Sequence, residues 1–158
     1  MKEIIIDIPH HPTLYLRNVV LDYNGTLAKD GKLKAVAKPL LESLTERYAV
    51  HVITSDTFGS VQAQLEGFEI TVKVLKSDDH TSEKAAYINE LSANFCAAVG
   101  NGNNDEKMLQ DAALSIALMG DEGCSTQTLM ASNIVCKSIE DALALLLNEK
   151  RLIATLRR

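Results

Sequence analysis

Short apolar runs alternate with helix-like segments along most of the chain, and several of these runs stop abruptly at a polar residue. The run at 19–21 stops at Asp22, and the run at 49–53, which is apolar apart from His51, stops at Thr54. Continuous apolar runs of this length are typical of parallel strands that are buried on both faces. Strands that alternate with helices predict a parallel sheet with helices on both sides, which is a three-layer, doubly wound α/β fold.

The pattern also predicts where the elements lie. Pro9 and Pro12 indicate a turn between the first two strands and therefore an N-terminal β-hairpin. Thr81 or Ser82 is the expected N-cap of the third helix. The expected strands are 3–8, 14–23, 49–54, 70–75, 95–99, 114–119 and 133–136, and the expected helices are 38–48, 58–65, 81–91, 105–112 and 138–158, the last in two pieces.

Size and composition restrict the class of protein. The 158 residues suit a single domain spanning 1–158, and the balance of 46% hydrophobic to 23% charged residues is that of a soluble globular protein. A net charge of -5 argues against a nucleic-acid partner. We expect a cytoplasmic protein without a membrane partner, because the sequence has no signal peptide and no apolar stretch of membrane-spanning length. Three cysteines without C-x-x-C spacing predict reduced thiols rather than disulfides or zinc.

The polar residues at the predicted strand ends suggest phosphoryl transfer. Transfer through an aspartyl-phosphate needs a carboxylate nucleophile, a hydroxyl for a phosphate oxygen, a fixed cation, and acidic groups for Mg²⁺. The chain supplies candidates in order: Asp22, then Thr54, then Lys84 in a predicted helix, then Asp105. In parallel sheets ligands bind beyond the carboxyl ends of the strands, which is where these residues are expected.

These motifs resemble the haloacid dehalogenase (HAD) superfamily. The resemblance lies in Asp22-Tyr-Asn-Gly-Thr-Leu27, the strand-end Thr54-Ser-Asp56, the helical Lys84 and Gly100-Asn-Gly-Asn-Asn-Asp105, and it covers about residues 14–145. It is closest to the phosphorylation domain of P-type ATPases, and to a group of soluble P-type-ATPase-like proteins with the same variant motifs. The resemblance implies a Rossmann-like HAD fold and a Mg²⁺-dependent phosphohydrolase or phosphotransferase.

The resemblance also implies roles for single residues. Asp22 would accept the phosphoryl group, and the Asp22 carboxylate and the Asn24 carbonyl would bind Mg²⁺ together with Asn101 and Asp105. Asn104 and Asp105 would orient Lys84 and the water shell of the metal. The residues implied to hold phosphate oxygens are Tyr23, Asn24 and Gly25 through their backbone N–H groups, with Thr54, Ser55 and Lys84.

Two departures from the HAD pattern predict slow turnover. Phosphatases of the superfamily carry a second Asp where this chain has Asn24, which can hydrogen-bond a water but cannot take its proton. Asn101 replaces the usual metal-binding Asp, and a neutral amide is a weaker Mg²⁺ ligand unless Asp105 or water compensates. An aspartyl-phosphate on Asp22 could therefore be long-lived.

Spacing excludes a cap domain. Core elements fill the intervals from Asp22 to Thr54 and from Thr54 to Lys84, which leaves no segment for a cap or for the nucleotide-binding insertion of the ATPases. An open site suits a phosphorylated macromolecule, or a small molecule if a homo-oligomer supplies the lid from a neighbouring subunit.

Other interpretations stay open at this point. A non-catalytic phosphate- or partner-binding module on the same fold is the main alternative, favoured by Asn24 and Asn101. A receiver-like signalling domain ranks last, because such domains need a carboxylate cluster before the acceptor and Asp7 is the only Asp that precedes Asp22. Lys76 competes with Lys84 for the role of fixed cation, and Asp56 is expected to cap the helix near residue 58 rather than to catalyse.

Overall fold

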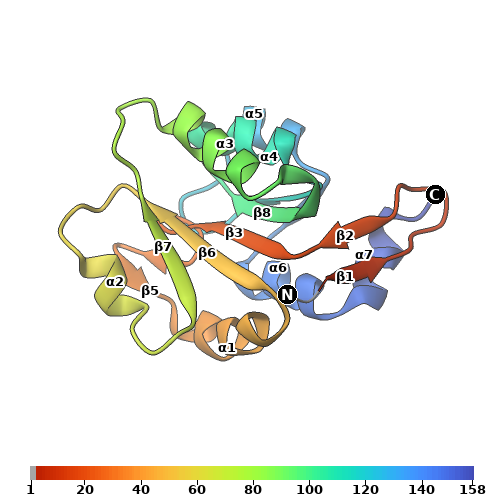
Figure 1. The fold of residues 1–158 in the computed structure, drawn as a ribbon, viewed down its shortest axis with the longest axis horizontal. Helices are drawn as coiled ribbons and strands as arrows, with labels where there is room; N and C mark the ends of the chain where they lie inside the picture. The colour runs from red at the N-terminus through yellow and green to blue at the C-terminus, as the bar shows by residue number, and fades with distance from the viewer. Residues whose placement is uncertain (1–2) are drawn as a thin grey trace.

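The computed structural model describes residues 3–158 and is built around a six-stranded sheet with helices on both faces (Figure 1). All neighbouring strands of this sheet are parallel, in the order β10-β9-β8-β3-β6-β7. The strands are β3 (Asn18–Asp22), β6 (Ala49–Thr54), β7 (Ile70–Val74), β8 (Cys96–Gly100), β9 (Leu114–Leu118) and β10 (Ile134–Cys136). The expected doubly wound α/β fold is confirmed.

The chain reverses its direction across the sheet beside β3. It runs outward from β3 to β6 and β7, then returns to place β8 on the other side of β3. The crevice at the carboxyl ends of β3 and β8 is therefore the switch point where such sheets bind ligands. Asp22 is the last residue of β3 and so lies at this crevice.

Helices cover the two faces of the sheet. They are α1 (Lys38–Arg47), α2 (Ser60–Gln64), α3 (His80–Glu90), α4 (Glu106–Asp111), α5 (Thr126–Ala131), α6 (Ile139–Leu147) and α7 (Glu149–Leu156), with 3-10 turns at Ala35–Ala37, Ala93–Phe95 and Asn103–Asp105. In Figure 1 the helices α3, α4 and α5 lie above the sheet, and α1 and α6 lie below it. Among the described residues, no helix is both long and apolar enough to cross a bilayer.

Alternation along β3 decides which way Asp22 points. Val19 and Leu21 belong to the larger apolar core, which also contains Leu41 of α1 and Leu143 of α6. Val20 belongs to the second core, with Ile88 of α3 and Met108 of α4. Because successive side chains of a strand point to opposite faces, Asp22 shares the face of Val20. The nucleophile candidate is therefore on the side of the sheet that α3 covers.

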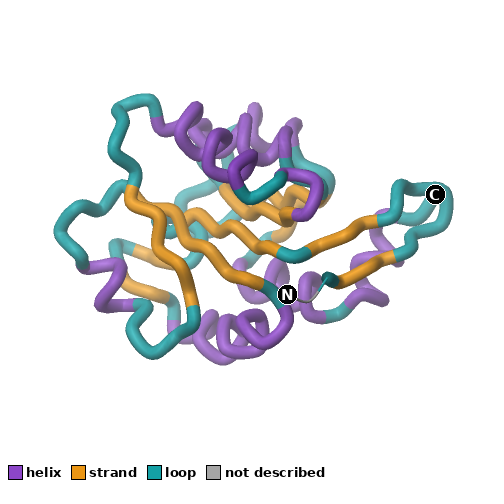
Figure 2. Tube along the Cα trace, in the orientation of Figure 1, coloured by secondary structure: helices purple, strands orange, loops and turns teal. Residues whose placement is uncertain are grey.

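Two antiparallel hairpins flank this core. The strands β1 (Ile4–Ile6) and β2 (Leu14–Leu16) form the N-terminal hairpin that the prolines predicted, and it projects from one end of the molecule beside α7 (Figure 2). The strands β4 (Ala28–Lys29) and β5 (Lys32–Leu33) are joined by Asp30 and Gly31, both with positive φ. Positive φ at both central residues is the type I′ geometry of tight hairpins.

The structure corrects several local expectations. The run at 14–23 is not one strand, because Arg17 separates β2 from β3 and the two strands belong to different sheets. The cap of α3 is Asp79, whose side chain accepts a hydrogen bond from the Ser82 N–H at 3.1 Å. The helix expected at 58–65 begins only at Ser60, and α5 is a helix that the sequence pattern did not predict.

Candidate active site

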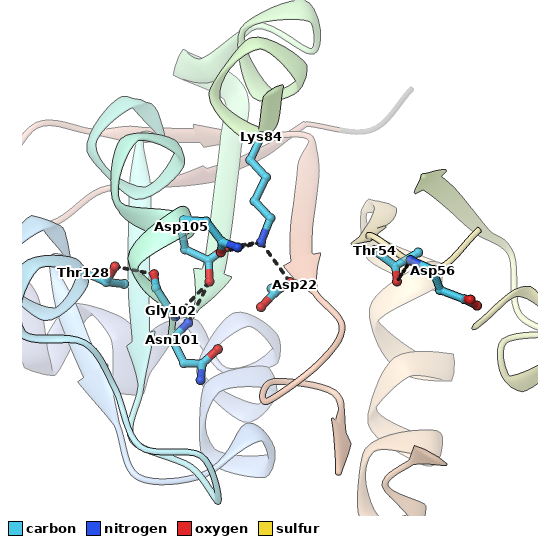
Figure 3. Close-up of polar contacts among 9 residues, drawn as sticks. Asp22, Thr54, Asp56, Lys84, Asn101, Gly102, Asp105 and Thr128 are labelled. Atoms are coloured by element: carbon cyan, nitrogen blue, oxygen red, sulfur yellow. Dashed lines mark hydrogen bonds and ion pairs between the residues drawn. The ribbon is translucent and has the colours of Figure 1, made fainter. Parts of the chain in front are cut away.

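Lys84 is the centre of the polar cluster at the switch point. Its Nζ donates to Asp22 Oδ1 at 3.1 Å, to Asn104 Oδ1 at 2.9 Å and to Asp105 Oδ1 at 2.8 Å. Figure 3 shows the side chain reaching from α3 between the two carboxylates. Residues from three segments of the chain thus meet at one ammonium group, and Lys84 rather than Lys76 takes this position.

The helix α3 presents Lys84 to the sheet because of its spacing. Lys84 and Ile88 are four residues apart and therefore lie on the same face, which packs on the second apolar core. Lys84 is only 3% exposed, so three acceptors replace its water shell. A buried ammonium is stable only when paired, and this pairing fixes the position of the cation.

Asp105 holds the loop after β8 as well as Lys84. Its Oδ2 accepts from the N–H groups of Asn101 at 3.0 Å and Gly102 at 3.1 Å, while Oδ1 faces Lys84. Gly100 makes this possible, because a Cβ at that residue would lie 2.5 Å from the Asp105 carboxyl group. Asp105 is 0% exposed and does not line the adjoining cavity.

The pKa of Asp22 is raised from its ordinary value of 3.8 to about 7. Burial is the main cause, the negative charge of Asp105 adds to it, and Lys84 opposes it. Burial disfavours the charge of Lys84, but Asp22 and Asp105 outweigh this effect and raise its pKa. One cation faces two buried carboxylates, so the cluster favours a further positive charge.

A cavity of about 210 Å³ opens beside this cluster. It brings together most of the residues that the motifs predicted. Thr54 closes the opposite wall from Asp22 (Figure 3), and its Oγ1 accepts from the Asp56 N–H at 3.0 Å, which leaves the hydroxyl hydrogen for a ligand. The cavity is lined by Asp22, Asn24, Thr54, Ser55, Leu75, His80, Lys84, Asn101, Gly102, Asn104 and Glu122.

The loop after Thr54 is braced by Asp56. Its carboxylate accepts from the N–H groups of Phe58 and Val61, both at 3.0 Å, and from the Ser60 hydroxyl at 2.6 Å. These hydrogen bonds hold the pKa of Asp56 below its usual value. The expectation that Asp56 is the N-cap of α2 is wrong, because that position is Gly59, but the Asp56 carboxylate still accepts from the first turn of that helix. It does not line the cavity.

The structure corrects the expectation for two backbone donors. The N–H of Tyr23 donates to the Ile53 carbonyl at 3.1 Å, and the N–H of Gly25 donates to the Ala28 carbonyl at 3.1 Å. Both groups are thus committed to backbone hydrogen bonds and cannot hold phosphate in this conformation. The Tyr23 side chain is also buried, with its hydroxyl donating to Gly31 O at 3.0 Å.

His80 and Glu122 line the cavity but were not predicted. His80 opens α3, four residues before Lys84, so its place on the helix could have suggested it. Glu122 lies in the loop after β9, and no motif marks it. Its position depends on how this loop folds back toward Gly25.

The residues present fit Mg²⁺. Within residues 3–158, no three His, Cys, Asp or Glu side chains form a metal cage. Mg²⁺ does not need one, because it is usually held by one or two carboxylates, water and substrate phosphate. Asp22, Asn24 and Asn101 all line the cavity and offer a carboxylate, a carbonyl and an amide, and the two carboxylates around the single Lys84 ammonium favour a further cation there.

Replacing Lys84 by Met should destabilise the fold strongly. It leaves Asp22 and Asp105 buried without a counter-ion, and breaking a buried ion pair typically costs about 3–5 kcal/mol. Urea unfolding near neutral pH measures this loss, and Lys76→Met is the matched control, because Lys76 is exposed and should change stability by less than about 0.5 kcal/mol. Equal stability of the two variants would show that the Lys84 cluster does not support the fold.

The sequence resembles two curated proteins of Methanocaldococcus jannaschii. It is 58% identical over 60 residues to "Uncharacterized protein MJ0073", a match that covers 38% of this chain and 64% of that protein. It is 44% identical over 39 residues to "Uncharacterized protein MJ0072", covering 25% of this chain and 89% of that protein. The chain thus spans less than two thirds of the first relative. No family model matches the chain.

Solved structures with a similar fold include phosphatases and a "putative HAD superfamily (subfamily III A) hydrolase" from Legionella pneumophila, which has a TM-score of 0.70 at 16% identity and covers 89% of this chain and 87% of that one. The 3-deoxy-D-manno-octulosonate 8-phosphate phosphatase of Moraxella catarrhalis, crystallised with magnesium, phosphate and KDO, has a TM-score of 0.70 at 18% identity, covering 90% of this chain and 94% of that one. The Yersinia pestis phosphatase of the same name has a TM-score of 0.69 at 13% identity, covering 97% and 96%. This chain therefore has the Rossmann-like HAD fold, and it belongs to the same protein family as MJ0072 of Methanocaldococcus jannaschii.

Proposed function

We propose that the protein is a Mg²⁺-dependent phosphohydrolase or phosphotransferase that works through an aspartyl-phosphate on Asp22. The observation that carries the proposal is the contact of Lys84 Nζ with Asp22, Asn104 and Asp105 at the rim of a polar cavity. We also place the protein with the soluble P-type-ATPase-like group, on the motifs around Asp22 and Asp105.

The first step would be attack of Asp22 on phosphorus. Lys84 holds Oδ1, so Oδ2 is the oxygen that bonds to phosphorus while the bond to the leaving group breaks. The Thr54 hydroxyl would bind a phosphoryl oxygen, the positive charge of Lys84 would offset the phosphoryl charge, and Asp105 would keep Lys84 in place. Bound Mg²⁺ would supply further neutralisation of the phosphoryl charge, with Asp22, Asn24 and Asn101 as its protein ligands.

Asn24 would make both proton transfers slow. The leaving group needs a proton in the first step, and the water that attacks phospho-Asp22 must lose one in the second. Asn24 lines the cavity but has no acidic proton to give and no basic site to receive one. Both protons would then be exchanged with solvent, which favours substrates with good leaving groups.

The substrate we propose is a small phosphate ester or acyl phosphate, or an exposed phosphoryl group of a larger molecule. A cavity of about 210 Å³ takes a phosphoryl group and a small part of its substituent. The HAD-fold neighbour named for 3-deoxy-D-manno-octulosonate 8-phosphate is consistent with a small ester. A macromolecular substrate would need no lid, whereas a small one would be enclosed if a second subunit covered the cavity.

A non-catalytic phosphate-binding module is the second candidate, because Asn24 and Asn101 both remove charge that catalysis uses. It predicts reversible phosphate binding without a covalent product. The Lys84 cluster is compatible with such a binding module, since the charge of a fixed cation also attracts phosphate.

Incubation with acetyl phosphate and Mg²⁺ should add one phosphoryl group covalently to Asp22. Intact-protein mass spectrometry detects the adduct, and peptide mapping under acidic conditions locates it, because acyl phosphates are hydrolysed in base. Chelating Mg²⁺ should prevent the reaction. An unlabelled protein that still binds phosphate would favour the binding module, and a label on another residue would reject Asp22 as the acceptor.

A further inference from the structure

The loop between β9 and α5 brings an unassigned carboxylate to the cavity. Glu122 lines the same cavity as Asp22, Asn24 and Asn101. The sequence did not predict this position, because Glu122 lies far along the chain from Asp22 and belongs to none of the motifs. Since Asn101 is a weak ligand for Mg²⁺, a nearby carboxylate could compensate for it.

Gly25 shows how close Glu122 comes to Asn101. The Gly25 backbone has φ +77, and a Cβ at this residue would lie 2.8 Å from Asn101 Nδ2 and 3.1 Å from Glu122 Cδ. The side chains of Asn101 and Glu122 therefore pack against the same point of the loop that follows Asp22. The carbonyl of Asn24 belongs to the peptide that leads into Gly25, so the proposed metal ligands converge on this corner.

The loop that carries Glu122 is fastened to Asn101. Asn101 Nδ2 donates to the Gly123 carbonyl at 3.2 Å, and the Ser125 N–H donates to the Asn101 carbonyl at 2.8 Å. The loop also closes on itself, with the Gly123 N–H donating to Gly120 O at 3.0 Å. With its amide nitrogen donating to Gly123, Asn101 keeps its Oδ1 for a metal, and the same bond holds Glu122 beside it.

Charge distinguishes Glu122 from its neighbour in the loop. Asp121 forms an ion pair with Lys34 and does not line the cavity. Glu122 takes part in no ion pair within the described residues. Among residues 3–158, Lys84 is the single Lys or Arg that lines the cavity, and both its carboxylate partners are already buried with it.

We infer that Glu122 is a ligand of the divalent cation at this site and supplies the charge that Asn101 lacks. This inference rests on the proposed function, since it concerns the same Mg²⁺ site. It assigns Asp105 to holding Lys84 and the loop rather than to the metal, because Asp105 is fully buried behind the cavity wall. The cation would then be bound by Asp22, the Asn24 carbonyl, Asn101 Oδ1 and Glu122.

Calorimetric titration with Mg²⁺ alone tests the inference without turnover. Glu122→Gln should raise the Kd for Mg²⁺ by about tenfold or more. Asp121→Asn removes the same charge from the adjacent residue and should change the Kd by less than about twofold, because exposed charges at a distance are screened. Adding Asn101→Asp to Glu122→Gln should restore most of the affinity.

Each outcome decides the inference. An unchanged Kd in Glu122→Gln would overturn it, and if turnover fell at the same time, Glu122 would act in proton transfer instead. An equal loss of Mg²⁺ affinity in Glu122→Gln and Asp121→Asn would also overturn it, since the loss would then come from the net charge of the loop and not from a ligand. A wild-type protein that binds no Mg²⁺ at millimolar concentration would overturn it together with the metal assignment, whereas covalent labelling of Asp22 tests the nucleophile separately.

Discussion

Replacing Asp22 by Asn should lower Mg²⁺-dependent hydrolysis of p-nitrophenyl phosphate to the rate without protein, a fall on the order of 10³ or more. The amide keeps the size of the side chain. It can still accept the hydrogen bond that Lys84 Nζ donates to Asp22 Oδ1 at 3.1 Å in the wild-type protein. It lacks the second carboxylate oxygen that would bond to phosphorus. Release of p-nitrophenol measures the rate, and intact mass should show no phosphoryl adduct after incubation with acetyl phosphate.

The same variant should remain folded, which separates chemistry from stability. The pKa of Asp22 is about 7 in the folded protein against an ordinary value of 3.8, so the folded state binds more protons between these values. Without metal, the charge of Asp22 therefore disfavours folding progressively as pH rises from about 4 to 7. Asp22→Asn should be at least as stable as the wild type at about pH 8, with a smaller difference at about pH 5.

Thermal unfolding at the two pH values measures this comparison. A variant that is less stable at about pH 8 would mean that the Asp22–Lys84 pair supports the fold more than the burial of its charge opposes it. Residual turnover in a folded variant would mean that another group is the nucleophile. The two results are independent, because thermal unfolding is measured without substrate and turnover is measured with it.

The position of the candidate nucleophile could be predicted from sequence because it depends on a local pattern. An apolar run ending in an acid gives a buried strand with a carboxylate at its carboxyl end, and β3 ends at Asp22 as expected. Lys84 followed from a helical pattern and a motif, and its four-residue spacing from Ile88 turns it toward the sheet. The direction of each side chain depends on neighbours within one element, whereas the choice of Lys84 over Lys76 also used the order of the motifs along the chain.

The features that sequence did not predict depend on contacts between distant segments. The N–H of Tyr23 is taken by Ile53 because β3 pairs with β6 in a register that no motif states. Glu122 reaches the cavity because its loop hydrogen-bonds to Asn101, a contact across 22 residues of chain. Asp79 rather than Thr81 or Ser82 caps α3, with its carboxylate accepting from the Ser82 N–H, and the sequence offers several suitable cap residues close together.

Replacing Asn24 by Asp should raise the turnover of alkyl phosphates by about 10²–10⁴-fold, which is the range that a placed general acid or base contributes. Asn24 lines the cavity, and its side chain is exposed, so Asp can take its place without a change in packing. The new carboxyl group would give a proton to the leaving oxygen and later take one from the attacking water. Steady-state release of inorganic phosphate from an alkyl and an aryl ester measures the change.

The dependence on the leaving group distinguishes proton transfer from a mere change of charge. A p-nitrophenolate leaves without a proton, so the gain for the aryl ester should be confined to hydrolysis of phospho-Asp22, whereas the alkyl ester should gain in both steps. Asn24→Ala is the control, and it should gain for neither ester because it has no titratable group. The double variant with Asp22→Asn should be inactive, since the gain must act on the same aspartyl-phosphate. If Asn24→Asp and Asn24→Ala lose activity alike, the Asn24 amide itself serves the reaction, and its replacement of an acid is then a functional specialisation rather than a loss.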